Sequence, residues 1–118
     1  MTVQALFYAS LSLQPNMRRE VARDVAEAIH DAALAEDVDA ALLLSLAFHE
    51  SSLNPAAVNA KTGATGLLQI AKVHHAGVPL RNLTDARWSA RTGANLLRRA
   101  IDRRGGVQSG ICAYNGRA

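Results

Sequence analysis

The fold is decided by residues 41–70, which read ALLLSLAFHESSLNPAAVNAKTGATGLLQI and begin with a nearly continuous apolar run. At 3.6 residues per turn, Leu43, Ala47 and Glu50 fall on one face of a helix over residues 40–51. Because the opposite positions are also apolar, we expect this helix to be buried all round. A buried carboxylate must be paired, hydrogen-bonded or protonated, and a protonated glutamic acid suits general acid catalysis. Position alone, however, favours a glutamate that simply reaches solvent.

The composition points to packed helices. A chain of 118 residues can form one domain with a real core, but not two. Aromatic residues make up only 4%, and no long strand-like alternation of Val, Ile, Thr and Tyr occurs. We therefore predict an all-α, single compact domain whose core consists mostly of Ala, Leu, Val and Ile. The only cysteine, Cys112, excludes an internal disulfide but does not fix the compartment.

Apolar periodicity and capping residues predict four further helices. They cover residues 17–35, 66–73, 85–103 and 107–114. Asn16 and Thr84 are the expected N-caps of the two long helices, and Gly105 and Gly106 are expected to end the second one. Small side chains at Ala90, Gly93 and Ala94 should let a neighbouring helix approach this helix closely.

The first fifteen residues contain a short apolar piece that no Lys or Arg precedes. The positive region of a secretory signal is therefore missing, and the piece is too short to span a bilayer. We expect an N-terminal arm or short helix over residues 1–15, packed on the core, and one domain over residues 16–118. No export signal and no membrane insertion are expected.

The net charge of +3 hides a strong asymmetry along the chain. Residues 1–50 carry a net charge of −5, and residues 51–118 carry +8. A basic half favours an anionic partner, such as nucleic acid, an acidic glycopolymer or a membrane surface. A solvated helix face is the alternative, and charge alone does not choose between them.

Several chemistries find no support in the sequence. His74 and His75 are adjacent, so their side chains diverge, and neither H-E-x-x-H nor C-x-x-C occurs. No G-x-S-x-G elbow is present, and the segment from Gly63 to Gly66 lacks the lysine of a phosphate-binding loop. We therefore expect no metal and no cofactor. What remains is Glu50 together with three downstream motifs.

Four motifs follow one another in order. They are Glu50-Ser51, Asn54-Pro55-Ala56, Gly66-Leu67-Leu68-Gln69 and Ala113-Tyr114-Asn115-Gly116. Together they resemble the soluble lytic transglycosylase family, which is related in fold to goose-type lysozyme, over roughly residues 21–116. The resemblance implies a lysozyme-like helical domain over residues 16–118, in which the buried central helix ends at the catalytic glutamate.

The resemblance also implies a mechanism with one carboxylate. Glu50 would protonate the glycosidic oxygen between MurNAc and GlcNAc, and would then take the proton from the MurNAc C6 hydroxyl. That oxygen attacks C1 and leaves a 1,6-anhydro end. Ordinary glycosidases need two carboxylates, yet the sequence has no Asp or Glu between Ser51 and Thr84. The substrate-binding residues that the resemblance implies are Ser51, Asn59, Gln69, Ile70, Tyr114 and Asn115.

Simpler interpretations stay open for two of these residues. Gln69 can merely cap a helix, and Tyr114 can be a core residue whose hydroxyl is satisfied by hydrogen bonding. The family often has serine where Asn59 stands, so an amide would remake the hydrogen bond to substrate. Leu68 replaces a methionine of the family motif, which conserves volume.

Two rival functions remain. A hydrolytic muramidase would cut the same bond, and phage-type lysozymes place Asp and Thr nine and fifteen positions after the glutamate. Here these positions hold Asn59 and Thr65, so the carboxylate is missing. A basic helical module that binds nucleic acid or cell wall without catalysis is the second rival. Arg87, Arg91 and Arg98 would belong to its phosphate contacts, but no helix-turn-helix signature accompanies them.

The expected place of action follows from the expected substrate. Peptidoglycan lies outside the cytoplasmic membrane, so the protein should act on the wall in the periplasm or outside the cell. A wall-cutting domain without an export signal is most simply a phage endolysin or a virion-associated enzyme, and a domain excised from a larger secreted protein is the alternative. We expect peptidoglycan glycan strands as the partner, no nucleic acid, and a monomer.

Overall fold

The computed structural model describes residues 1–116. Six α-helices and one short 3-10 helix make up most of this part of the chain. They are α1 (Val3–Leu13), α2 (Arg19–Glu36), α3 (Ala40–Ser51), η1 (Lys72–His74), α4 (Leu80–Leu83), α5 (Ala86–Arg104) and α6 (Val107–Asn115). The described residues form no strand, and the all-α prediction is confirmed. Within this part of the chain, no helix is both long and apolar enough to cross a membrane.

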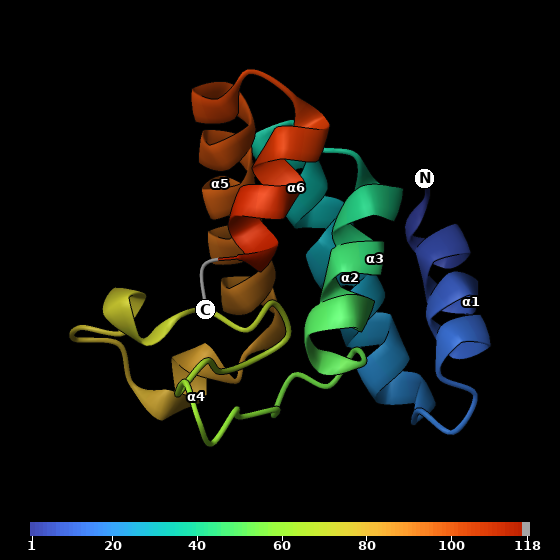
Figure 1. Cartoon of the computed structure of the whole chain (residues 1–118). Helices are drawn as coiled ribbons and strands as arrows, with labels where there is room; N and C mark the ends of the chain where they lie inside the picture. The colour runs from blue at the N-terminus through green and yellow to red at the C-terminus, as the bar shows by residue number, and fades with distance from the viewer. Residues whose placement is uncertain (117–118) are drawn as a thin grey trace.

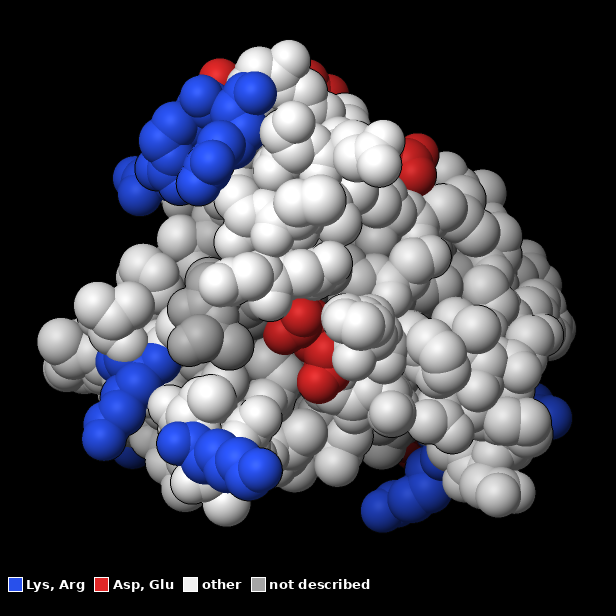
Figure 2. Space-filling view, viewed as in Figure 1, with Lys and Arg blue, Asp and Glu red and all other residues white. Residues whose placement is uncertain are grey.

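The helices are arranged around α2, which packs against α1, α3 and α5. Figure 1 shows α3 in front of α2, with α1 on one side and the pair of α5 and α6 on the other. The long connection between α3 and α5 forms the lower edge of the molecule in this view. On the same face, acidic atoms lie in a hollow near the centre, and basic side chains stand around it (Figure 2). The segment between α3 and α5 therefore borders the hollow.

The central helix forms as predicted but is not buried all round. Asp39 caps it, because its side chain accepts a hydrogen bond of 2.9 Å from the Leu42 N–H. Its apolar side joins the core. Its exposed positions recur at every fourth residue and form a strip along the other side of the helix. The buried positions are Leu43, Leu44, Leu46, Ala47 and Ser51, and the exposed ones are Ala41, Ser45 and His49. One side of the helix end that carries Glu50 therefore faces solvent.

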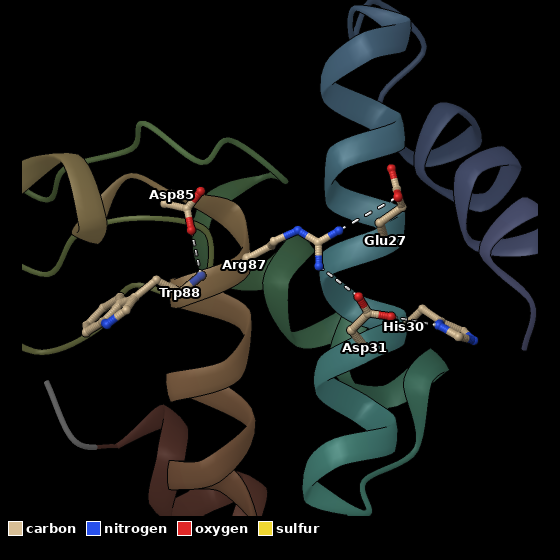
Figure 3. Close-up of polar contacts among 6 residues, drawn as sticks. All are labelled: Glu27, His30, Asp31, Asp85, Arg87 and Trp88. Atoms are coloured by element: carbon tan, nitrogen blue, oxygen red, sulfur yellow. Dashed lines mark hydrogen bonds and ion pairs between the residues drawn. The ribbon is translucent and has the colours of Figure 1, made fainter.

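Much of the charge asymmetry is matched inside the molecule, between α2 and α5. Arg87 donates to Asp31 at 2.8 Å and lies 3.8 Å from Glu27 (Figure 3). One turn further along α5, Arg91 donates to Glu36 at 2.7 Å. Two arginines that the nucleic-acid alternative needs for phosphate contacts are thus turned toward α2. A third, Arg98, is held in the same region: its guanidinium donates to the Asp37 carbonyl and to Asp102 of its own helix.

These contacts also change the ionisation of two carboxylates on α2. Hydrogen bonds from Asn95 and Arg91 lower the pKa of Glu36 below its ordinary value. Hydrogen bonds with His30 and Arg87 lower the pKa of Asp31 in the same way (Figure 3). Both carboxylates are thereby held in the charged form that the arginines bind.

Two predicted N-caps are wrong. Helix α2 begins at Arg19 and its N-cap is Arg18, without a side-chain cap, so Asn16 lies outside the helix start. Thr84 ends the short helix α4, which the sequence did not predict, and its hydroxyl donates to the Leu80 carbonyl at 2.9 Å. The cap of α5 is instead Asp85, whose carboxylate accepts from the Trp88 N–H at 2.9 Å.

The predicted helix over residues 66–73 is also wrong. Gly66 and Gln69 have φ angles of 88° and 51°, in the left-handed region that a right-handed helix cannot contain. Residues 66–69 form a tight turn instead, and only Lys72–His74 make a single 3-10 turn. The predicted last helix is present and runs one residue further, to Asn115.

Candidate active site

A hairpin-like turn at residues 66–69 forms the inner part of the segment between α3 and α5. Thr65 and Ile70 close it, because each N–H donates to the carbonyl of the other, at 3.2 and 2.9 Å. Gly66 is required at its first position. Besides its positive φ, a Cβ at Gly66 would lie 2.2 Å from the Leu83 carbonyl oxygen. The turn therefore rests directly on the backbone that precedes α5.

Three buried hydroxyl groups from three helices hold this turn. Ser51 of α3 donates to the Leu67 carbonyl at 2.7 Å. Ser89 of α5 accepts from the Leu68 N–H at 3.0 Å, and Tyr114 of α6 donates to the Leu68 carbonyl at 2.9 Å. Buried backbone N–H and C=O groups need hydrogen-bond partners. A buried turn, unlike a helix or a sheet, cannot supply all of them from its own backbone. We call this set of Ser51, Ser89 and Tyr114 the hydroxyl clamp.

Gln69 ends the turn in a strained conformation. Its φ of 51° costs a non-glycine residue roughly 1–2 kcal/mol. Its side-chain amide donates to the carbonyls of Ala57 and Gly66, at 3.1 and 3.0 Å, and so joins the turn to the preceding loop. Strain of this kind is often found where a side chain must be presented to a ligand. Gln69 is not a helix cap, since no helix forms here.

A cleft of about 360 Å³ opens beside this turn. Its walls come from the ends of α3 and α6, from the loop before the turn, and from η1. The residues that line it are His49, Glu50, Asn59, Thr62, Ala64, Gln69, Ala71, Lys72, Val73 and Asn115. Of these described lining residues, Glu50 alone carries a carboxylate. It is partly buried, at the last turn of α3.

The structure brings four of the predicted site residues together on the cleft. They are Glu50, Asn59, Gln69 and Asn115. The Asn59 side-chain oxygen accepts from the N–H groups of Lys61 and Thr62, at 2.9 and 3.2 Å, which shapes the loop. Contact of these side chains with a substrate stays a prediction.

The other three predicted binding residues lie behind the cleft wall. Ser51 and Tyr114 are buried members of the hydroxyl clamp, with exposed fractions of 9% and 3%. Ile70 is fully buried, and its backbone closes the turn with Thr65. In the structure, these three residues contact the turn at residues 66–69 and hold it in place behind the cleft. For Tyr114, the structure shows the core position and hydrogen-bonded hydroxyl of the simpler interpretation.

Sequence reasoning missed three side chains that shape the site, those of Ser89, Lys72 and Val73. Ser89 completes the hydroxyl clamp, and its signal is a serine within the otherwise apolar face of α5. Gly93, where the sequence predicted the close approach of a helix, lies on the same face; a Cβ there would lie 2.6 Å from the Leu68 side chain, so the nearest neighbour is the turn. Lys72 and Val73 line the cleft from η1, inside a segment that was predicted as the end of a longer helix.

A second hollow of about 520 Å³ lies between α2 and the start of α5. It is larger, but two of the three charged residues that line it serve the fold: Arg87 binds Asp31 of α2, and Asp85 caps α5 (Figure 3). Among residues 1–116, no group of three or more His, Cys, Asp or Glu side chains is placed to hold a metal ion. The cleft at Glu50 is therefore the better candidate for chemistry.

Comparison with known proteins agrees with this choice. The family model for the transglycosylase SLT domain matches residues 27–117, which include α3, the cleft loop and every lining residue of the cleft. Searches of the curated proteins and of the solved structures gave no match. The family that the four motifs indicated is thereby confirmed. The chain belongs to the transglycosylase SLT domain family, whose members cleave peptidoglycan.

Proposed function

We propose that this protein is a lytic transglycosylase that cleaves the β-1,4 bond between MurNAc and GlcNAc and leaves 1,6-anhydroMurNAc ends. The observation that carries the proposal is the position of Glu50. It stands at the end of the central helix, on a cleft whose described lining holds no second carboxylate. Membership of the family supports cleavage of peptidoglycan.

In the first step, Glu50 acts as a general acid. Its carboxylic acid gives a proton to the glycosidic oxygen, the bond from that oxygen to C1 of MurNAc breaks, and the GlcNAc side leaves with a free hydroxyl. Positive charge then develops at C1. In the second step, the Glu50 carboxylate takes the proton of the C6 hydroxyl while the C6 oxygen bonds to C1. Glu50 regains its proton, and no water is consumed.

The charge at C1 requires stabilisation that a second carboxylate gives in other glycosidases. The neutral amide and hydroxyl side chains that line this cleft are those of Asn59, Thr62, Gln69 and Asn115. Of these, the Asn59 oxygen and the Gln69 N–H groups are already hydrogen-bonded within the loop and the turn. The substrate's own N-acetyl group is the other candidate. A turn that is fixed from three helices suits this task, because dipoles that are already oriented need not reorganise during the reaction.

Two observations support transglycosylation over hydrolysis by a muramidase. A hydrolase of the phage type would need a carboxylate at position 59 and a free hydroxyl at position 65. Asn59 has an amide there, and its oxygen already accepts two backbone N–H groups. Thr65 is buried, with an exposed fraction of 4%, and its hydroxyl donates to the Gly63 carbonyl at 2.9 Å. Both side chains are thus used in shaping the loop.

Product analysis tests the proposal. Purified sacculi are digested with the wild-type protein, and the released fragments are separated and weighed by mass spectrometry. We expect fragments that end in 1,6-anhydroMurNAc, which are lighter by one water than hydrolytic products. Reducing MurNAc ends without anhydro ends would show that the protein is a muramidase. Intact sacculi, together with binding to nucleic acid in a gel shift at physiological salt, would favour the non-catalytic alternative.

The expected substrate also sets the place of action. We propose that the protein meets the wall from the periplasm or from outside the cell, as a phage endolysin or a virion-associated enzyme would. Lysis of cells to which the protein is added from outside would support the route of a virion-associated enzyme. Lysis of cells that produce the protein, but only after the inner membrane is permeabilised, would support the route of an endolysin.

A further inference from the structure

One cationic side chain stands on the cleft. Lys72, at the start of η1, is the only Lys or Arg among the described residues that line it. Its aliphatic stem runs beside Gly63, where an added Cβ would lie 3.3 Å from the Lys72 Cδ. The 3-10 turn is tied to the cleft wall, because His75 Nε2 lies 2.7 Å from the Ile70 carbonyl oxygen. The ammonium group is thus carried on a supported stem at an exposed position of the cleft.

The charge of Lys72 is not used inside the described part of the molecule. The arginines of α5 that lie nearest α2 bind carboxylates there, as Arg87 and Arg91 do. Within residues 1–116, no ion pair includes Lys72. Among the described lining residues, the positive charge of the second half of the sequence is therefore represented by Lys72. A flexible ammonium group with three donors suits an anion whose position varies along a polymer.

We propose that Lys72 binds a carboxylate that the glycan strand carries on the lactyl group of MurNAc. Two sources share this chemistry: the lactyl carboxylate of a strand without peptide, and a carboxylate of the peptide that is attached there. The inference rests on the proposed function, because it names the part of the same substrate that the cleft selects. Val73, whose exposed fraction is 80%, lies beside Lys72 on the lining and offers apolar contact next to the charge.

A set of three variants and three ligands tests the assignment. The variants are Lys72→Met, Lys72→Arg, and Lys61→Met as the matched control, since Lys61 is exposed on the same segment but does not line the cleft. The ligands are peptide-bearing strands, strands stripped of peptide by an amidase, and neutral GlcNAc oligomers, whose Kd is measured. Lys72→Met should lower kcat/KM on carboxylate-bearing strands about two- to five-fold at low salt, the range of an exposed ion pair.

The pattern across ligands decides the outcome. Lys72→Arg and Lys61→Met should stay close to wild type, and the Kd for neutral oligomers should not change. A loss only on stripped strands assigns the lactyl carboxylate, and a loss only on peptide-bearing strands assigns the peptide carboxylate. A loss on both kinds of strand shows that Lys72 binds whichever of the two carboxylates is present. Wild-type rates for Lys72→Met, an equal loss for Lys61→Met, or an equal loss with neutral oligomers would overturn the inference. A wild-type protein that releases no anhydro ends would overturn the proposed function first.

Discussion

Two regions of the molecule differ in how their backbone groups are satisfied. One is the pair formed by α2 and α5, and the other is the segment between α3 and α5. The helices satisfy their own backbone groups, and their arginine and carboxylate contacts lie largely at the surface, where Arg91 has an exposed fraction of 60%. The turn at residues 66–69 is buried and has few backbone partners of its own. It depends on the hydroxyl clamp, in which each side chain serves a different backbone group.

This difference determines where a substitution costs most. Removing the partner of a buried backbone group costs about 1–3 kcal/mol, whereas an exposed ion pair contributes about 0.2–1 kcal/mol. The cleft wall is therefore more sensitive than the helical frame, although it has less regular structure. Variants in the two regions test this contrast.

The largest effect is expected at Gly66. Gly66→Ala places a methyl group 2.2 Å from the Leu83 carbonyl oxygen in addition to the backbone strain, and we expect a loss of about 4 kcal/mol or more in the free energy of unfolding. Gly77→Ala is the matched control. Its φ of 73° is similar, but no atom lies within 4 Å of the added Cβ, so only strain of about 1–2 kcal/mol remains. Equal losses in urea unfolding would show that the turn is not tightly packed.

A smaller loss is expected from the hydroxyl clamp. Ser89→Ala removes the acceptor that the Leu68 N–H uses, and should lower the free energy of unfolding by about 1–3 kcal/mol. The activity of the folded fraction should fall as well, because the same turn carries Gln69 to the cleft. Ser45→Ala, on the exposed strip of α3, should change stability by no more than about 0.5 kcal/mol, in the stabilising direction. Similar losses for both serines would refute the clamp.

The smallest effect is expected on the helical frame, and it depends on pH. The lowered pKa of Glu36 means that its contacts stabilise the fold above the ordinary value of 4.5 and lose this effect as pH falls through the lowered pKa. Glu36→Gln should therefore be less stable than wild type by about 1 kcal/mol near pH 7. Thermal unfolding should show this difference shrinking in acid below pH 4.5. A difference that grows in acid would contradict the assigned contacts, and the exposed Glu20→Gln controls for loss of charge.

The sequence was sufficient where local signals determine the structure. The apolar run after Asp39 specifies α3 because the cap and the periodicity lie within the helix itself. The turn was predicted wrongly because its conformation depends on distant partners. Ser89 and Tyr114 hold Leu68 from 21 and 46 residues further along the chain, and their hydrogen bonds outweigh the helical preference of the local sequence.

The same contrast between local signals and distant partners holds for the candidate site. Glu50, Asn59, Gln69 and Asn115 were named through the family resemblance, and the structure places all four on one cleft. Lys72 was not named, because residues 66–73 were predicted as one helix, whereas the observed turn and the 3-10 helix after it decide which side chains reach the cleft.

In the proposed mechanism, Glu50 alone supplies the proton and takes it back. Its most direct test is the rate at which Glu50→Gln releases 1,6-anhydroMurNAc ends from sacculi. The control is Asp24→Asn, an exposed carboxylate that lines the other hollow. We predict that Glu50→Gln stays folded and loses at least about a hundredfold in rate, the scale of general acid–base catalysis, while Asp24→Asn keeps the wild-type rate. Release of anhydro ends by Glu50→Gln at a rate near that of wild type would contradict the account.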